Sequence, residues 1–136
     1  MCYNVCMLTF DEICYLAGFF DGEGYIGIHR YTPSKQWALN IVVAQKDKSV
    51  LEEFQTKTGY GKLLQDKTTK VWKWKIASRR AIKLINLMYP YLRVKKPQAT
   101  VAKYMYEVLD AKDPEKYRKY KFFSDVIKLL NQGKIL

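Results

Sequence analysis

Hydrophobic residues recur at helical spacing near the start of the chain. Four of them stand at positions i, i+3, i+4 and i+7, which lie on one face of a helix. This spacing predicts a helix with one buried face over about residues 9–22. These residues are Ile13, Leu16, Ala17 and Phe20. Thr9 begins a capping box, the signature of a helix start. A second face of this helix carries only small residues, Cys14, Gly18 and Gly22, which indicates close approach of another helix.

Beyond this helix, apolar and polar residues alternate, which predicts strands. The four strands are expected over about residues 24–31, 36–45, 61–66 and 70–77. A short helix separates the two pairs of strands and ends at Gly59 or Gly61. Each strand has one apolar face, which helices can cover, and one face of polar, basic and aromatic residues.

Three more helices are predicted in the second half of the chain. Ser78 caps a helix to about residue 88, and Pro97 opens the next one, to about residue 109. Asp113 is the N-cap of a last helix that runs to Asn131. The order α-β-β-α-β-β-α-α-α predicts a single α+β domain over residues 1–136 with an antiparallel sheet.

The charge of the chain narrows the choice of partners. Lys and Arg number 24 against 13 Asp and Glu, a formal net charge of +11, which favours nucleic acid or an anionic membrane surface. The sequence has no apolar run long enough to span a membrane and no secretory signal, so we expect no membrane partner. Three cysteines without metal-ligand spacing predict reduced thiols and an intracellular protein. A protein that is merely rich in lysine is the alternative.

The uncovered face of the predicted sheet has the chemistry of a DNA-binding surface. A curved sheet with basic and amide side chains can lie in a major groove and read base edges, and its apolar positions can read shape or thymine methyl groups. The alternative is a face that water simply wets, but the net charge favours double-stranded DNA. The predicted DNA-facing set is Tyr25, Gly27, His29, Tyr31, Gln36, Ala38, Asn40, Val42, Lys62, Leu64, Asp66, Lys73 and Lys75.

Two carboxylates, Asp21 and Glu23, stand where the first helix ends, although acids are disfavoured at a helix C-terminus. A carboxylate beside DNA would repel phosphate unless a divalent cation is held between them. Glu23, at the start of the predicted strand, is the expected metal ligand. Asp21 assists through its carbonyl or side chain, or only caps the turn. An ordinary polar turn is the alternative for both.

The segment LAGFFDGEG, residues 16–24, resembles the signature of the LAGLIDADG homing endonucleases. The segments VAQKDKS and YLRVKKPQA, and the order of elements, resemble those of the same family. The resemblance implies a curved four-stranded sheet that forms a DNA-binding saddle. It also implies a site-specific endonuclease that cuts both strands of a long pseudo-palindromic site and leaves short 3′ overhangs.

The same resemblance implies roles for individual residues. Glu23 and Gly22 form the metal site, Gln45 orders solvent around the scissile phosphate, and Lys95, or its neighbour Lys96, lies near the metal and phosphate. The implied cofactor is Mg²⁺, with Mn²⁺ as a substitute and Ca²⁺ binding without cleavage. A single signature implies a homodimer, whose expected interface is formed by Cys14, Gly18, Asp21 and Gly22.

Two other functions remain open from the sequence. One is a binder that does not cleave, either an intron RNA maturase or a DNA-binding regulator of the same fold, and the other is a dimeric basic scaffold. His29, the only histidine, is expected to contact a base or phosphate rather than act in catalysis. Three tryptophans are expected in the core rather than stacked on bases, namely Trp37, Trp72 and Trp74.

Overall fold

The structure is a computed structural model that describes residues 8–31, 36–109 and 112–133. Its elements follow the predicted order, with one short 3₁₀ turn (η2) added. They are α1 (Phe10–Glu23), β1 (Gly24–Arg30), β2 (Trp37–Gln45), α2 (Lys48–Thr58), β3 (Lys62–Gln65), β4 (Trp72–Ala77), α3 (Ser78–Met88), η2 (Tyr89–Tyr91), α4 (Lys96–Val108) and α5 (Lys116–Asn131). No helix in these described ranges is long and apolar enough to cross a membrane.

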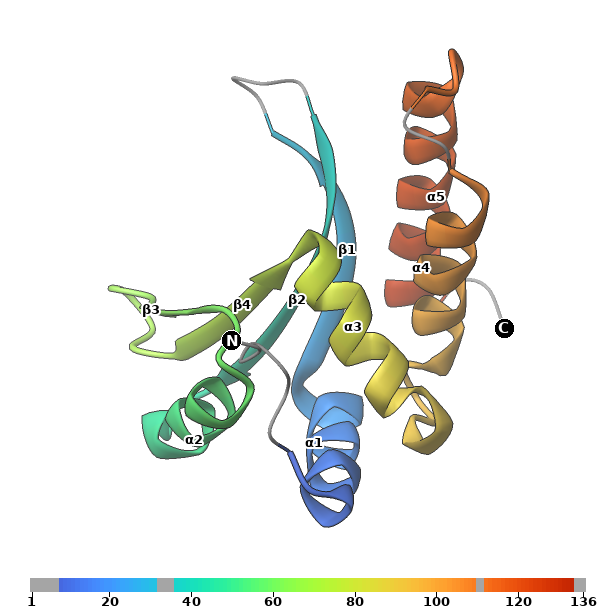
Figure 1. Ribbon diagram of the computed structural model, residues 1–136. Helices are drawn as coiled ribbons and strands as arrows, with labels where there is room; N and C mark the ends of the chain where they lie inside the picture. The colour runs from blue at the N-terminus through green and yellow to red at the C-terminus, as the bar shows by residue number, and fades with distance from the viewer. Residues whose placement is uncertain (1–7, 32–35, 110–111, 134–136) are drawn as a thin grey trace.

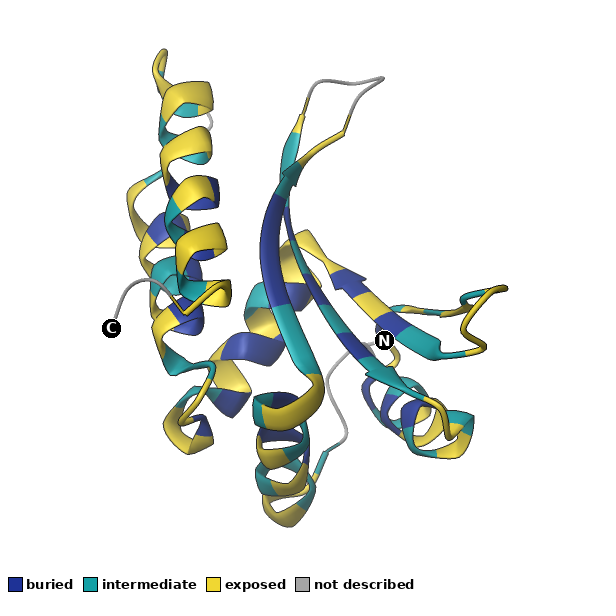
Figure 2. Cartoon of the chain, turned by 180° about the vertical axis from the view of Figure 1, so that it is seen from behind, coloured by how far each residue is buried: buried dark blue, intermediate teal, exposed yellow. Residues whose placement is uncertain are grey.

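The four strands form one antiparallel sheet in the order β1-β2-β4-β3, which confirms the predicted α+β fold. The helices gather on one side of this sheet and leave the other side open (Figure 1). Buried residues alternate with less buried ones along β2 and with exposed ones along the second half of β4, as the sequence pattern requires (Figure 2). The core side of the central strand β2 carries Leu39, Ile41 and Val43, each at most 1% exposed.

Helix α1 begins with the predicted capping box. The Thr9 hydroxyl accepts the backbone N–H of Glu12 at 3.2 Å, and the Glu12 carboxylate accepts that of Thr9 at 2.9 Å. The helix passes directly into β1 at Gly24, where any Cβ would overlap the Phe20 ring. Glycine at this position therefore lets the strand leave the helix tip without displacing a core aromatic ring. Glu23 is the last residue of the helix, one position beyond the predicted end at about residue 22.

Helix α5 covers the edge of the sheet at β1. The Ser124 hydroxyl donates to the carbonyl oxygen of Ile28 at 2.8 Å, and the Asn131 amide donates to that of Ile26 at 3.0 Å. These side chains satisfy carbonyls that an edge strand would otherwise leave to water. They fix the long pair of α4 and α5 beside β1 (Figure 1).

Two predicted helix starts are wrong. Ser78 does not cap α3: it is the first helical residue, its φ is +58°, and Ala77 at the N-cap position makes no side-chain bond. The reason is the abrupt junction, since β4 ends at Ala77 and leaves no room for a separate cap. Helix α5 begins at Lys116, because the Asp113 carboxylate accepts the N–H of Glu115 within a preceding turn.

The tryptophans follow the core prediction to different degrees. Trp74 is fully buried, packs against Phe54, and donates its indole N–H to the carbonyl oxygen of Tyr60 at 2.8 Å. Trp37 and Trp72 are only half-buried and lie at the margins of the core.

Candidate nucleic-acid interface

The open side of the sheet is hollowed into a groove, here called the sheet-face groove. It extends from the end of α1 across β1, β2 and β4. Seven of the predicted DNA-facing residues line it together with Glu23, and only Ala44 was missed. The lining residues are Glu23, Tyr25, His29, Tyr31, Asn40, Val42, Ala44, Lys73 and Lys75. Ala44 could have been found from the sequence, since it continues the alternation that begins at Asn40 and Val42.

The strand register explains why these residues share one surface. Tyr25 pairs with Val42, Val42 with Lys75, and Lys75 with Lys62, which forms one row across all four strands. The neighbouring row contains Ala44, Lys73 and Leu64. Residues paired across an antiparallel sheet project from the same face, so each row presents basic and apolar groups side by side.

Two aromatic side chains of β1 are joined above the strand. The Tyr25 hydroxyl and His29 Nε2 lie 3.1 Å apart, and the two rings are nearly parallel at 5.9 Å between centroids. Burial raises the pKa of Tyr25. Burial, followed by the charges of Lys128 and Lys75, lowers the pKa of His29, so its imidazole is neutral near pH 7.

Gly27, which we predicted to face DNA, lies beneath this aromatic pair and is buried, and its contact with DNA stays a prediction. A Cβ at this position would collide with the Tyr25 hydroxyl and with His29 Nε2. The alternation of the strand does place Gly27 on the correct face. Its neighbours on that face then close over it, because it has no side chain of its own.

A second pair orders the far end of the groove. The Tyr31 hydroxyl donates to the Asn40 side-chain oxygen at 3.0 Å, and the Asn40 amide reaches the carbonyl oxygen of Ala38 at 3.4 Å. Arg80, which is absent from the predicted set, lines a neighbouring depression with Tyr31 and Lys62. Its guanidinium lies 5.5 Å from the centre of the Tyr60 ring. Arg80 is the third residue of α3, so the alternating pattern of the strands could not identify it.

Two other predicted DNA-facing residues have different surroundings. The Asp66 carboxylate accepts the N–H groups of Thr68 and Thr69 in the β3–β4 turn. The bond from Thr69, followed by that from Thr68, lowers the pKa of Asp66. Gln36 precedes β2 and lines a cavity on the helix side of the sheet rather than the sheet-face groove, and its contact with DNA stays a prediction. Strand alternation does not govern a residue outside the strand.

Glu23 is exposed at one end of the sheet-face groove. Asp21, two residues earlier, joins the end of α1 to a loop that is distant in the sequence. The Asp21 carboxylate accepts the backbone N–H of Arg93 at 2.9 Å and that of Lys95 at 3.0 Å. The segment before α4 is therefore held against the end of α1. The Lys96 ammonium lies over the Tyr89 ring, 4.8 Å from its centre.

The sheet register brings Gln45 close to the same end of α1, here called the candidate catalytic corner. Gly24 pairs with Val43, so Gln45, two residues further along β2, lies beside the last turn of α1. Its side-chain oxygen accepts the N–H of Lys46 at 2.9 Å, which orients the amide. The main chains of the three predicted catalytic residues, Glu23, Gln45 and Lys95, thus approach one another near the end of α1. Strand alternation places the Gln45 side chain on the face of β2 that carries Ile41 and Val43.

The described residues contain no cluster of three or more Asp, Glu, His or Cys side chains. Glu23 contributes one exposed carboxylate, and oxygen ligands of this kind suit Mg²⁺. One carboxylate does not complete a coordination shell. The donor set therefore fits a cation only if phosphate, water or a second protein copy supplies the remaining ligands.

The small-residue face of α1 is open in the protomer. A Cβ built at Gly18 or Gly22 meets no atom of the described residues within 4 Å beyond the backbone of α1 itself, and both glycines are exposed. Cys14, on the same face, is a half-buried free thiol. Asp21 differs from the rest of the predicted interface, because its carboxylate is already engaged within the protomer.

Comparison with known proteins supplies a family match. The model of the LAGLIDADG endonuclease family matches residues 16–108, more than half of the chain. No curated protein sequence matches. The chain resembles the homing endonuclease I-CvuI, solved with its target in the presence of 2 mM Ca, with a TM-score of 0.78 and 21% identity over 89% of this chain and 82% of that chain.

Two further solved structures share this fold. The archaeal intron-encoded homing endonuclease I-Vdi141I, complexed with DNA, has a TM-score of 0.74 and 14% identity, over 88% of this chain and 84% of that chain. The LAGLIDADG meganuclease I-AabMI, bound to uncleaved DNA, has a TM-score of 0.67 and 19% identity, over 82% of this chain. Only 43% of the I-AabMI chain is covered, so this protein corresponds to about half of that longer chain.

Proposed function

The chain belongs to the LAGLIDADG endonuclease family, and on this premise we propose that it is a homing-type DNA endonuclease. It cuts both strands of a long pseudo-palindromic site by metal-dependent hydrolysis and leaves short 3′ overhangs. One observation carries the proposal: the basic sheet-face groove ends at the exposed carboxylate of Glu23. The surface that attracts DNA is thus continuous with a carboxylate that can hold a cation against phosphate.

The residues at this corner divide the work of phosphodiester hydrolysis. Glu23 and the main chain at Gly22 would hold Mg²⁺, which would supply an activated water and stabilise the leaving oxygen. Gln45 orients water beside the scissile phosphate. Lys95 neutralises negative charge that develops on the phosphate, which is the effect of a cation positioned in advance. Mn²⁺ replaces Mg²⁺ in this role, whereas Ca²⁺ binds without supporting cleavage.

The acting form is a homodimer. A single protomer has one Glu23, and two such corners are needed to cut two strands. The exposed face of Gly18 and Gly22 allows two α1 helices to approach closely, and contact there brings both Glu23 side chains near a common two-fold axis. The match to about half of the longer I-AabMI chain supports the same arrangement, with a second copy in place of the other half.

A cleavage selection tests this function. The protein is incubated with a library of randomised DNA duplexes and Mg²⁺, and cut ends are sequenced. We expect one enriched pseudo-palindromic site with 3′ overhangs. Glu23→Gln should bind that site and leave it intact, whereas Glu53→Gln, at an exposed acid of α2, should cut as the wild type does.

Failure has a defined meaning in this assay. If the wild-type protein cuts no duplex with Mg²⁺ or Mn²⁺, the endonuclease proposal is rejected. Tight binding of a structured intron RNA in preference to every duplex would then assign the protein to the maturase class. Binding of duplex DNA without cleavage would assign it to the DNA-binding regulators.

A further inference from the structure

A second hollow lies on the opposite side of the sheet from the sheet-face groove. We call it the helix-side cavity and define it by Trp37 of β2, Arg79 of α3, Tyr106 of α4, and Lys116, Tyr117 and Tyr120 of α5. Trp37 alternates with Ala38, so it projects from the face of β2 that the helices cover. The cavity is therefore separate from the candidate catalytic corner at Glu23.

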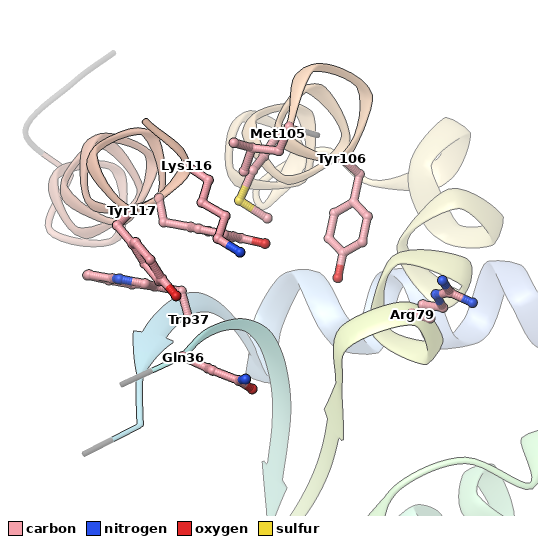
Figure 3. A pocket seen from close by; sticks show the side chains of 9 residues that line it. Gln36, Trp37, Arg79, Met105, Tyr106, Lys116 and Tyr117 are labelled. Atoms are coloured by element: carbon pink, nitrogen blue, oxygen red, sulfur yellow. The ribbon is translucent and has the colours of Figure 1, made fainter. Parts of the chain in front are cut away.

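The cavity is rich in groups that donate hydrogen bonds. Two cations, Arg79 and Lys116, and three tyrosine hydroxyls line it, and none of the described lining residues is Asp or Glu. Figure 3 shows Lys116 and Tyr106 extending from the helices into the hollow and Trp37 on its sheet side, whereas Arg79 stands at the far edge with its guanidinium turned away from Lys116. Burial, followed by the neighbouring Tyr120, raises the pKa of Tyr106, which keeps its hydroxyl protonated as a donor. Such a lining favours an anion.

The same walls offer flat aromatic surfaces. The rings of Trp37 and Tyr120 are parallel to within 3°, with centroids 6.4 Å apart, and the Tyr117 ring at the rim is 52% exposed. The cavity encloses about 440 Å³, within the range of small-molecule sites and far more than one phosphate group fills. A long apolar acid would not suit it, because among the described lining residues only Met105 and Leu109 add aliphatic surface. A ligand that fits must combine an anion with a flat ring.

We propose that the helix-side cavity binds a nucleotide. Its phosphate is held by Lys116, Arg79 at the far edge adds a second positive charge, and its base lies against the aromatic rings at the rim, Tyr117 among them. Guanidinium and ammonium groups bind phosphate oxygens, and aromatic side chains stack on any of the bases. The nucleotide is either a free mononucleotide or one unit of a single strand, because a base within a duplex is already stacked and paired. This site does not depend on the proposed endonuclease activity.

Equilibrium binding tests the site with three probes: adenosine monophosphate, inorganic phosphate, and a short single-stranded DNA of mixed sequence. We expect saturable binding of the mononucleotide, with competition by phosphate. The double variant Arg79→Gln, Lys116→Gln should weaken it roughly tenfold or more, the effect of losing charged hydrogen bonds. The matched double variant Arg118→Gln, Lys121→Gln removes two cations of α5 that do not line this cavity, and it should bind as the wild type does.

A further variant separates stacking from charge. Tyr117→Ala should weaken binding of the mononucleotide and leave phosphate binding unchanged, and circular dichroism verifies that each variant is folded. Single-stranded DNA that binds through the cavity more tightly than the mononucleotide would identify a strand as the source. The absence of saturable nucleotide binding, equal binding by both double variants, or binding of phosphate alone would overturn the proposal. Glu23→Gln should retain nucleotide binding, so loss of cleavage and loss of this site are distinguishable.

Discussion

The Asp21 carboxylate accepts the backbone N–H of Lys95 at 3.0 Å, across 74 residues of sequence. Its other oxygen accepts the N–H of Arg93, so both oxygens hold the segment that precedes α4. An acid in the last turn of a helix is locally unfavourable, and these two N–H donors offset that cost. The relationship gives Asp21 a positioning role: it holds the main chain of Lys95 near the end of α1, where Glu23 is exposed.

Replacing Asp21 by Asn should separate this positioning role from DNA binding. Asn keeps the size of the side chain but has one acceptor oxygen for two N–H donors. We expect the cleavage rate at saturating enzyme to fall about 10- to 100-fold, because small displacements of a catalytic group are costly. The affinity for the target should change far less. Single-turnover cleavage and gel-shift titration measure the two quantities.

The matched control is Asp11→Asn, which removes an exposed carboxylate from the first turn of the same helix. It should cleave as the wild type does. Equal losses of cleavage in both variants would show that the charge of α1, rather than the bond to Lys95, matters.

Substitution of Gly18 should affect the dimer and the protomer in opposite directions. Because a Cβ at this position meets nothing within 4 Å, Gly18→Ala should stabilise the isolated protomer by up to about 1 kcal/mol. Gly18→Leu should keep the fold but yield a monomer without cleavage activity. Light scattering and thermal unfolding measure both effects, and Thr56→Leu, at an exposed position of α2, is the control for added bulk. A Gly18→Leu protein that remains dimeric and active would refute the interface.

Substitution of Gly27 should disrupt the aromatic pair above β1. The Cβ of Gly27→Ala collides with the Tyr25 hydroxyl and His29 Nε2, which must move apart. We expect a several-fold loss of affinity for the target duplex, measured by gel shift, with the fold retained because both groups are the ends of side chains that can turn. Tyr25→Phe removes the same hydrogen bond without a clash and should lose less. Unchanged affinity in Gly27→Ala would mean that the pair takes no part in DNA binding.

The titration of His29 should make stability depend on pH. Its pKa in the folded protein is lowered from 6.5, so the unfolded chain binds a proton more readily than the native state does. The corresponding stability is present above pH 6.5 and is lost as the pH falls from there through the lowered pKa. Thermal unfolding between about pH 7.5 and about pH 5 should show this decrease, and His29→Gln should lack that component. Because His29 is the only histidine, proton NMR of its ring follows the titration directly. A midpoint at or above 6.5 would contradict the prediction.

The sequence alone determined the elements and the face to which most side chains belong. Helical and alternating periods depend on residues a few positions apart, so α1, the strands and most of the sheet-face groove could be predicted from local pattern. The signature around Glu23 is also local, which is why the expected metal ligand and the small-residue face of α1 follow from a few neighbouring residues.

The tertiary structure decided relationships between distant or irregular segments. Asp21 finds its partners in Arg93 and Lys95 only because η2 and the loop after it dock on the end of α1. Gly27 becomes buried because Tyr25 and His29 join above it, and Gln36, which precedes β2, lines the helix-side cavity. The helix-side cavity combines side chains from one strand and three helices. Such contacts depend on how elements pack against one another, and no period within a single element encodes that packing.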